Sequence, residues 1–282
     1  MIEPARSAPR PRGEETRAPV DLHDVRAFVL DMDGVLYRGD TALAGAREFV
    51  ERLRVLGIPH LFLTNNSSRT PKQYADKLLR LGMHAAPERI LTSAQVAAAD
   101  LARQACPQDR VLVVGGAGLR EALALAGLTL ADRYWEASFV VVGLDTAITY
   151  EKLSQAALAI RRGARFLGTN ADRSFPTERG LEPGAGALLA ALQAATGVAP
   201  KIYGKPEPEM FAAALHALGT PAAATAMVGD RLETDIAGAA RAGLVTVAVA
   251  TGVCTEEELR AADPAPDFVF PSVVELRAAL ED

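Results

Sequence analysis

The chain has 282 residues, of which 49% are hydrophobic, and its 30 basic and 35 acidic residues give a formal net charge of -5. A chain of this length and composition can bury a large core and forms one or two domains. The negative net charge provides no basic surface for a nucleic acid polymer or an anionic membrane, so a small solute is the expected partner.

The first twenty residues are rich in proline and arginine and lack the continuous apolar core of a signal peptide, so residues 1–20 are expected to be a disordered tail. No stretch approaches the roughly 20 apolar residues that cross a membrane. Cys106 and Cys254 are too few for a disulfide framework and are expected in the core of a protein in a reducing compartment. These features predict a cytoplasmic protein.

From Val25 onward, short β-branched runs alternate with longer segments of helical periodicity, which is the pattern of βα units around a mostly parallel sheet. The expected strands are residues 27–31, 60–64, 111–114, 139–142, 165–168, 226–229, 245–249 and 268–270. The expected helices are residues 45–56, 71–81, 94–104, 119–126, 150–161, 184–195, 208–218 and 235–242. The predicted fold class is therefore α/β.

The strands that end at Asp31, Thr64 and Asp230 deliver polar groups at their carboxyl ends, where open α/β sheets bind ligands. The strands between them end in glycine-rich or asparagine-containing turns. This middle block, residues 83–199, is expected to be a second α/β unit inserted into a first one formed by residues 21–82 and 200–282. An insertion at that place would lie over the strand ends as a lid.

Asp31 and Asp33 directly follow the apolar run 27–30, so two carboxylates are expected at the tip of a buried strand, with Gly34 allowing a tight turn. A carboxylate there can attack phosphorus. An Asp after a strand is also a common turn former, but two crowded carboxylates repel each other unless a cation compensates. Mg²⁺, which prefers oxygen ligands, is the natural cation where a phosphate also binds.

Three further segments could complete such a site. Thr64 can offer its hydroxyl group, and Asn65 its backbone N–H, to a phosphate oxygen. Lys205, held between Gly and Pro in a stiff loop, would supply positive charge. Asp230 ends another apolar run, whereas Asp235 is either part of the site or only a first-turn acid of the next helix.

Two further features of the sequence give little support to other functions. The glycine-rich loop at residues 115–118 fails the dinucleotide-binding pattern because Glu121 stands where the third glycine is needed, so a tight turn is expected there. The four histidines are scattered and none follows a predicted strand, which gives little support to histidine catalysis.

Taken in this order, the four segments resemble the motifs of the haloacid dehalogenase-like (HAD) phosphatase superfamily. Asp31-Met32-Asp33-Gly34 is similar to the first motif, Thr64 to the second, Lys205 to the third, and Gly229-Asp230 with Asp235 to the fourth. The short gap before Thr64 and the long gap before Lys205 match the type IIA branch, which includes p-nitrophenyl phosphatases and phosphoglycolate phosphatases. The resemblance implies a Rossmann-like core with a parallel sheet and an inserted α/β cap of the C2 type.

The resemblance also implies roles for individual residues. Asp31 would be the nucleophile that forms an aspartyl-phosphate, and Asp33 would be the acid for the leaving alcohol and then the base for water. Mg²⁺ would be held by Asp31, the main-chain carbonyl of Asp33 and Asp230, while Asp235 would orient Lys205 or a metal-bound water. The groups expected to hold the phosphoryl group are Thr64, Asn65, Asn66 and Lys205.

The expected function is hydrolysis of small phosphate monoesters. Asn170, Asp172 and Phe175 are candidates for substrate contacts from the cap, or else they only cap a helix and pack. Phe175 stands where pyridoxal phosphatases have a histidine, which argues against pyridoxal phosphate. A phosphomutase and a receiver-like phospho-switch without turnover are the alternatives. A small phosphorylated metabolite is the expected partner, and the resemblance leaves open a homodimer formed through the cap.

Overall fold

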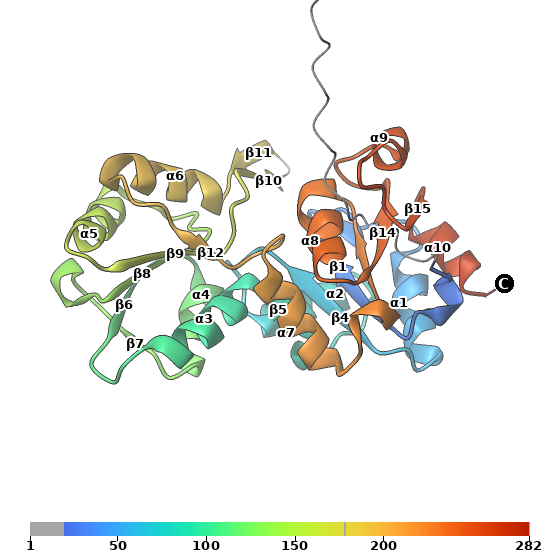
Figure 1. Ribbon diagram of the computed structural model, residues 1–282, viewed down its shortest axis with the longest axis horizontal. Helices are drawn as coiled ribbons and strands as arrows, with labels where there is room; N and C mark the ends of the chain where they lie inside the picture. Colours follow the sequence, from blue (N-terminus) through green and yellow to red (C-terminus); the bar gives the residue numbers. More distant parts are fainter. Residues whose placement is uncertain (1–19, 178, 282) are drawn as a thin grey trace, which may run out of the picture.

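The computed structural model describes residues 20–177 and 179–281, so the predicted disordered tail lies outside the described residues except for Val20. Two lobes lie side by side along the long axis, each built around a parallel sheet (Figure 1). We call the lobe around the six-stranded sheet the core and the lobe around the five-stranded sheet the cap. The predicted α/β class, a Rossmann-like core with an inserted α/β cap, is confirmed.

The core sheet has the order β15-β14-β13-β1-β4-β5, with every neighbouring pair parallel. Its strands are β1 (Ala27–Asp31), β4 (His60–Thr64), β5 (Ile90–Thr92), β13 (Thr225–Gly229), β14 (Val245–Val249) and β15 (Phe268–Phe270). From β1, the next two strands of this sheet along the chain are added on one side and the last three on the other side. This is the doubly wound Rossmann order, and the direction of strand addition reverses next to β1. All residues of β1 are buried, because helices cover both faces of the sheet.

The cap sheet has the order β12-β9-β8-β6-β7 and is also parallel. Its strands are β6 (Arg110–Val114), β7 (Thr129–Leu130), β8 (Phe139–Val142), β9 (Arg165–Gly168) and β12 (Lys201–Ile202). Two antiparallel hairpins complete the strands: β2 (Tyr37–Arg38) with β3 (Thr41–Ala42), and β10 (Ser174–Thr177) with β11 (Gly180–Pro183). The cap strand order is that of flavodoxin-like sheets, so the cap has its own reversal point between β6 and β8.

Ten α-helices connect these strands within the described residues. They are α1 (Ala46–Val55), α2 (Pro71–Arg80), α3 (Ser93–Gln104), α4 (Ala117–Leu125), α5 (Tyr150–Arg161), α6 (Ala185–Thr196), α7 (Pro208–Leu218), α8 (Ala237–Arg241), α9 (Glu256–Arg260) and α10 (Val273–Ala279). A capping box begins α2: the Thr70 hydroxyl accepts from the Gln73 N–H, and the Gln73 side-chain oxygen accepts from the Thr70 N–H. Helices α3, α4 and α7 lie between the two sheets (Figure 1).

The apolar interior follows the two-residue period of the strands. Phe28 and Leu30 of β1 belong to a cluster on one face of the core sheet, whereas Val29 belongs to a cluster on the other face. That second cluster continues through Leu101 of α3 to Val111 of the cap. The core and the cap therefore share one continuous apolar interior, and the cap is held against the strand ends of the core.

Every predicted strand and helix is present, with small shifts at the ends, and the structure adds several short elements. Two of these bear on the domain boundaries. Strand β5, inside the segment predicted as the insertion, pairs with β4 of the core, and β12 pairs with β9 of the cap. Both strands have only two or three residues, too few for a hydrophobic period to be recognised. We propose that the insertion runs from α3 to β12.

The cysteine prediction is wrong. Cys106 is exposed and Cys254 is half-buried, and both are free thiols. Each lies in a loop; Cys106 is not buried there, and Cys254 packs only in part against the cluster of Ile236, Ala248 and Leu259. Among the described residues, no helix is long and apolar enough to cross a membrane.

Candidate active site

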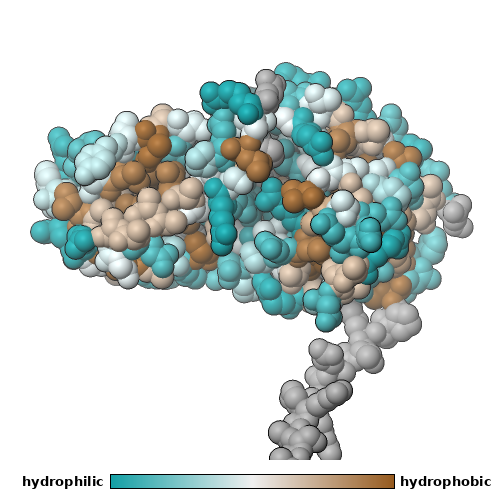
Figure 2. All heavy atoms as spheres, turned by 90° about the horizontal axis from the view of Figure 1, so that it is seen from above, coloured by the Kyte–Doolittle hydropathy of each residue, from teal (hydrophilic) through white to brown (hydrophobic). Residues whose placement is uncertain are grey.

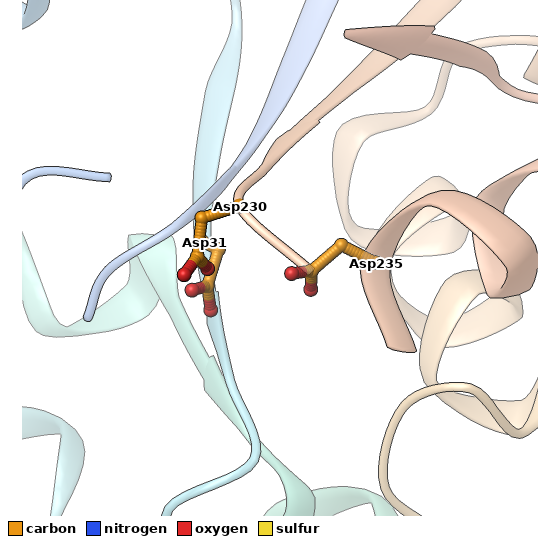
Figure 3. A group of neighbouring side chains, drawn as sticks. All are labelled: Asp31, Asp230 and Asp235. Atoms are coloured by element: carbon orange, nitrogen blue, oxygen red, sulfur yellow. The ribbon is translucent and has the colours of Figure 1, made fainter. Parts of the chain in front are cut away.

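The strand order of the core reverses between β1 and β13, and acidic residues stand at the carboxyl ends of both strands. Asp31 is the last residue of β1, and Asp230 directly follows β13. Figure 3 shows the carboxylates of Asp31 and Asp230 next to each other, with Asp235 facing them from the following turn. Open α/β sheets bind ligands in the crevice at such a reversal, so the fold itself places these carboxylates where a ligand is expected.

The turn after β1 depends on Gly34. Its φ of +87° lies in the left-handed region, and a Cβ atom there would lie 2.5 Å from Asp230 Oδ2. The Thr251 hydroxyl donates to the Gly34 carbonyl at 2.6 Å. Glycine is therefore required both by the backbone conformation and by the close approach of the second acidic strand end.

Lys205 is buried between two carboxylates. Its Nζ lies 2.5 Å from Asp31 Oδ1 and 2.7 Å from Asp235 Oδ1, and only 3% of the residue is exposed. Burial by itself lowers the pKa of Lys205, but the charges of Asp235 and Asp31 and their hydrogen bonds raise it above its ordinary value. The lysine thus stays charged and fixes the orientation of the Asp31 carboxylate.

Asp235 is held by a π-helical turn, Leu232–Ile236, a rare conformation that often occurs at functional sites. Its Oδ2 accepts from the Arg231 N–H at 3.2 Å, while its Oδ1 lies 2.7 Å from Lys205 Nζ. Both carboxylate oxygens are therefore engaged by the protein. Asp235 thus contacts Lys205 and lies next to Asp31 and Asp230.

The three carboxylates could hold a cation. Asp31, Asp230 and Asp235 each offer an oxygen, and these oxygens lie within 4.8 Å of one another. Asp230 Oδ2 accepts from the Val253 N–H at 3.0 Å, but Asp230 Oδ1 is buried with no hydrogen-bond partner among the described residues. Burial and the charge of Asp235 raise the pKa of Asp230 to about 6. A buried acceptor without a partner, in an all-oxygen set, fits a hard cation such as Mg²⁺.

Asp33 lies at the wall of the cavity next to this cluster and is half-buried. Burial raises the pKa of its carboxyl group, and Lys77 is the largest of the positive charges that oppose this shift. A carboxyl group with a raised pKa keeps its proton more readily near neutral pH, as a proton donor must.

Thr64, Asn65 and Asn66 form the loop after β4. Thr64 lines the cavity, and its Oγ1 accepts from the Asn66 N–H at 3.1 Å. The Asn65 side chain spans the peptide groups of Lys205, accepting from its N–H at 2.7 Å and donating to its carbonyl at 3.0 Å. The side chain of Asn66 accepts from Ser68 and so stabilises its own loop. The asparagine side chains thus shape the site.

The cap residues predicted at the site lie beside this loop. Asn170 donates to Asp172 at 2.8 Å, and Asp172 also accepts from the Asn65 side chain at 3.2 Å. Asp172 and Phe175 line the cavity, whereas Asn170 is buried behind them and is absent from the described lining. Asn170 and Asp172 therefore link the cap to the core.

The cavity has a volume of about 1000 Å³ and is lined by the strand ends of both sheets. The sequence interpretation missed several of its charged lining residues: Arg69, Lys77, Arg120, Asp145, Lys152, Arg179 and Arg231. Most lie on helices or loops without a motif. Lys77 could have been recognised, because it is a charged residue that shares the apolar face of α2 with Tyr74 and Leu78 at helical spacing.

The glycine-rich loop of the cap has a structural role beyond a tight turn. The Gly118 N–H donates to the Ser68 carbonyl at 3.1 Å, and a Cβ atom on Gly118 would collide with the Arg69 carbonyl. The absence of side chains lets the core loop after Asn66 lie directly on the beginning of α4. These glycines bring the two strand-end edges close enough to enclose one cavity.

Comparisons with known proteins agree with this geometry. The pattern of the family described as haloacid dehalogenase-like hydrolase matches residues 28–129, and the HAD-hydrolase-like pattern matches residues 202–276. The first match includes Asp31 and the second includes Asp230, and most of the cap lies between the two matched ranges. The chain belongs to the haloacid dehalogenase-like hydrolases, and the predicted type IIA branch is confirmed by its relatives.

Three relatives illustrate the similarity. An acid sugar phosphatase of Staphylococcus aureus is 43% identical over 260 residues, which are 92% of this chain and all of that protein. The structure of a glycerol phosphate phosphatase of Mycobacterium tuberculosis in complex with magnesium has a TM-score of 0.84 at 38% identity, covering 91% of this chain and 76% of that one. A 4-nitrophenylphosphatase of Thermotoga maritima has a TM-score of 0.85 at 34% identity, covering 92% and 98%.

We predict that Gly34→Ala destabilises the protein more than Gly39→Ala does. Both glycines have positive φ, +87° and +55°, but a Cβ atom on Gly39 meets nothing within 4 Å. Gly39→Ala should cost about 1 kcal/mol for backbone strain alone, whereas Gly34→Ala must also displace Asp230. Urea unfolding in EDTA measures the difference, and equal losses in the two variants would contradict the assigned contact.

We predict that Asp230→Asn stabilises the metal-free protein at pH 7. The folded-state pKa of about 6 exceeds the ordinary value of 3.8, so the stability that protonated Asp230 contributes is fully present below about pH 3.8 and is lost as the pH rises through about 6. The neutral amide removes this loss, which is on the order of 1–3 kcal/mol. Unfolding in EDTA at pH 4 and pH 7 tests this, with exposed Asp24→Asn as control. A variant less stable than wild type at pH 7 would refute it.

Proposed function

We propose that the protein is a Mg²⁺-dependent phosphatase that hydrolyses small phosphate monoesters through an aspartyl-phosphate on Asp31. The observation that carries the proposal is the buried Asp31 carboxylate at the tip of β1, held by Lys205 Nζ at 2.5 Å and opening to a cavity of about 1000 Å³. The phosphatase names of the three relatives support the same reaction.

The residues divide the chemistry between them. A carboxylate oxygen of Asp31 forms a bond to phosphorus as the bond from phosphorus to the ester oxygen breaks, and Asp33 gives its proton to that oxygen as the alcohol leaves. Asp33 then takes a proton from a water molecule, whose oxygen attacks phosphorus and releases Asp31. Lys205 and the Thr64 hydroxyl hold the negatively charged phosphoryl oxygens throughout.

The metal site is proposed at Asp31, Asp230 and the main-chain carbonyl of Asp33. The buried Asp230 Oδ1, which has no hydrogen-bond partner among the described residues, supports this choice. Mg²⁺ at this place supplies positive charge that offsets the crowded carboxylates and the phosphate. Asp235, whose oxygens are engaged by Lys205 and the Arg231 N–H, orients Lys205 in this scheme.

We propose a small phosphorylated sugar or polyol as the substrate class. Acid sugar phosphatase and glycerol phosphate phosphatase are the names of two relatives. The cavity is large enough for such a molecule and is lined by polar and charged groups from both lobes. Of the predicted cap contacts, Asp172 and Phe175 reach this lining.

We also propose that the protein is cytoplasmic and that it forms a homodimer through the cap. The cap exposes large apolar side chains, with Leu125 81%, Trp135 55%, Tyr150 87% and Leu181 76% exposed. On the face that Figure 2 shows, hydrophobic residues gather over the cap at the left. Light scattering on the purified protein tests the dimer, and a monomer at all concentrations would dismiss it.

We predict that Asp31→Asn abolishes phosphate release from p-nitrophenyl phosphate, because the amide is not a nucleophile. Asp33→Asn should lower the rate by roughly 10²–10⁴-fold, the usual contribution of a general acid, with the largest loss for esters of poor leaving groups. Rates with Mg²⁺ and with EDTA give the metal dependence. Full activity in Asp31→Asn would rule out the proposed nucleophile.

The same assays separate the alternatives. A stable acyl-phosphate without turnover in the wild-type protein would indicate a receiver-like switch. Phosphate that moves between positions of one substrate without release would indicate a phosphomutase. The sustained release of inorganic phosphate supports the phosphatase.

A further inference from the structure

Lys77 is a buried lysine outside the catalytic cluster. Only Lys77 and Lys205 are buried among the lysines that the structure describes, with 7% and 3% of each residue exposed. Lys77 lies on the buried face of α2, next to Tyr74 and Leu78. Withdrawing an ammonium group from water is costly unless other groups interact with it, so its partners indicate what it does.

The contacts of Lys77 hold its charge in place but leave its hydrogen-bonding capacity mostly unused. Its Nζ lies 3.7 Å from the centroid of the Tyr37 ring and 3.7 Å from Asp40 Oδ1. The Asp40 side chain is 74% exposed, so water weakens that ion pair. An ammonium group has three donors, and a ring face and a distant carboxylate do not satisfy them.

Tyr37 ties this charge to the catalytic turn. It is 1% exposed, and its carbonyl accepts from the Gly34 N–H at 2.9 Å. Tyr37 also forms an isolated bridge with Asp33. The ammonium group therefore rests on a residue that is fixed relative to the proposed proton donor.

Lys77 and Asp33 line the same cavity, and the Tyr37 ring that Lys77 Nζ contacts belongs to the residue that bridges to Asp33. Burial raises the pKa of Asp33, and the charge of Lys77 opposes this more than those of Arg231, Arg69 and Lys205. For Asp31, by contrast, Lys205 is the main positive charge, and Lys77 is not among the principal influences. Lys205 thus serves the phosphoryl group, while Lys77 and Asp33 line the cavity together.

We propose that Lys77 binds an oxygen atom of the leaving group, namely one on the carbon next to the ester carbon. Lys77 would thus select phosphate esters that have an oxygen on that carbon. The inference rests on the proposed function, because the leaving group is the part of the ester that Asp33 protonates. A hydroxyl or a carboxylate oxygen would accept from the free donors of the ammonium group. An alkyl group at the same place would leave those donors buried without a partner, which costs affinity.

The test compares matched pairs of esters. 2-Hydroxypropyl phosphate is paired with propyl phosphate, and phosphoglycolate with ethyl phosphate, so the members of a pair differ only in the oxygen substituents of the carbon next to the ester carbon. Wild-type protein should have at least about tenfold higher kcat/KM for the oxygen-bearing member of a pair, and Lys77→Met should abolish most of that ratio. The pair in which Lys77→Met lowers the ratio shows whether Lys77 binds a hydroxyl or a carboxylate oxygen. An effect on Asp33 is told apart by its direction: weaker proton transfer would slow the alkyl ester, which has the poorer leaving group, more and so raise the ratio, whereas loss of the Lys77 contact lowers it.

The control is Lys72→Met, on the same helix. The Lys72 side chain is 77% exposed and pairs with Asp76, so its removal should leave the ratios and the rates unchanged. Thermal unfolding monitors the fold of each variant, and Lys77→Gln, which keeps a polar head, takes the place of Lys77→Met if the latter does not fold.

The outcomes separate the two proposals. An unchanged ratio in the Lys77 variants, or an equal loss on all four esters, would overturn the assignment of Lys77 to the leaving group. Wild-type protein that hydrolyses p-nitrophenyl phosphate but shows no preference within either pair would leave the phosphatase standing and refute the role of Lys77. Wild-type protein that hydrolyses no ester would refute both.

Discussion

The buried ion pair between Lys205 and Asp31 is the interaction on which the arrangement of the site depends. Removing Lys205 would leave the buried carboxylates of Asp31 and Asp235 without the positive charge that compensates them, which is strongly destabilising. The pair is supported from several directions. Asn65 holds both peptide groups of Lys205, Asp235 contacts Nζ, and Tyr203, two residues earlier, donates its hydroxyl to Asp100 of α3 at 2.7 Å. A lysine held this way cannot turn toward solvent.

The same supports join the core to the cap. Asn65 belongs to the loop after β4, and it contacts both Lys205 on the return from the cap and Asp172 within the cap. Ser67, from the same loop, lies 3.0 Å from the Thr169 hydroxyl of the cap. Glycines at residues 118 and 143 allow this approach, because side chains there would collide with the core loop. The geometry that fixes Lys205 is therefore also the geometry that encloses the cavity.

Much of this could be predicted because it depends on local sequence. Asp31 and Asp230 follow apolar runs, and in a parallel sheet the carboxyl ends of such strands meet at one edge. Helix α2 could be predicted because Thr70 is a favourable N-cap residue and Pro71 a favourable first helical residue. Elements of two or three residues, such as β5 and β12, could not be read, since their pairing is decided by neighbouring strands distant in sequence.

The sequence by itself determined the family, because the order and spacing of Asp31, Thr64, Lys205 and Asp230 define it. Each of these residues ends or follows a strand or lies in a stiff loop. Only the tertiary structure decided what surrounds these residues. It brought the side chain of Asn65 to the Lys205 backbone, placed Lys77 and Asp33 in the wall of one cavity, and exposed Cys106. The physical reason is that a strand or a turn is specified by neighbours in the chain, whereas burial and electrostatic environment arise from segments that are brought together only by folding.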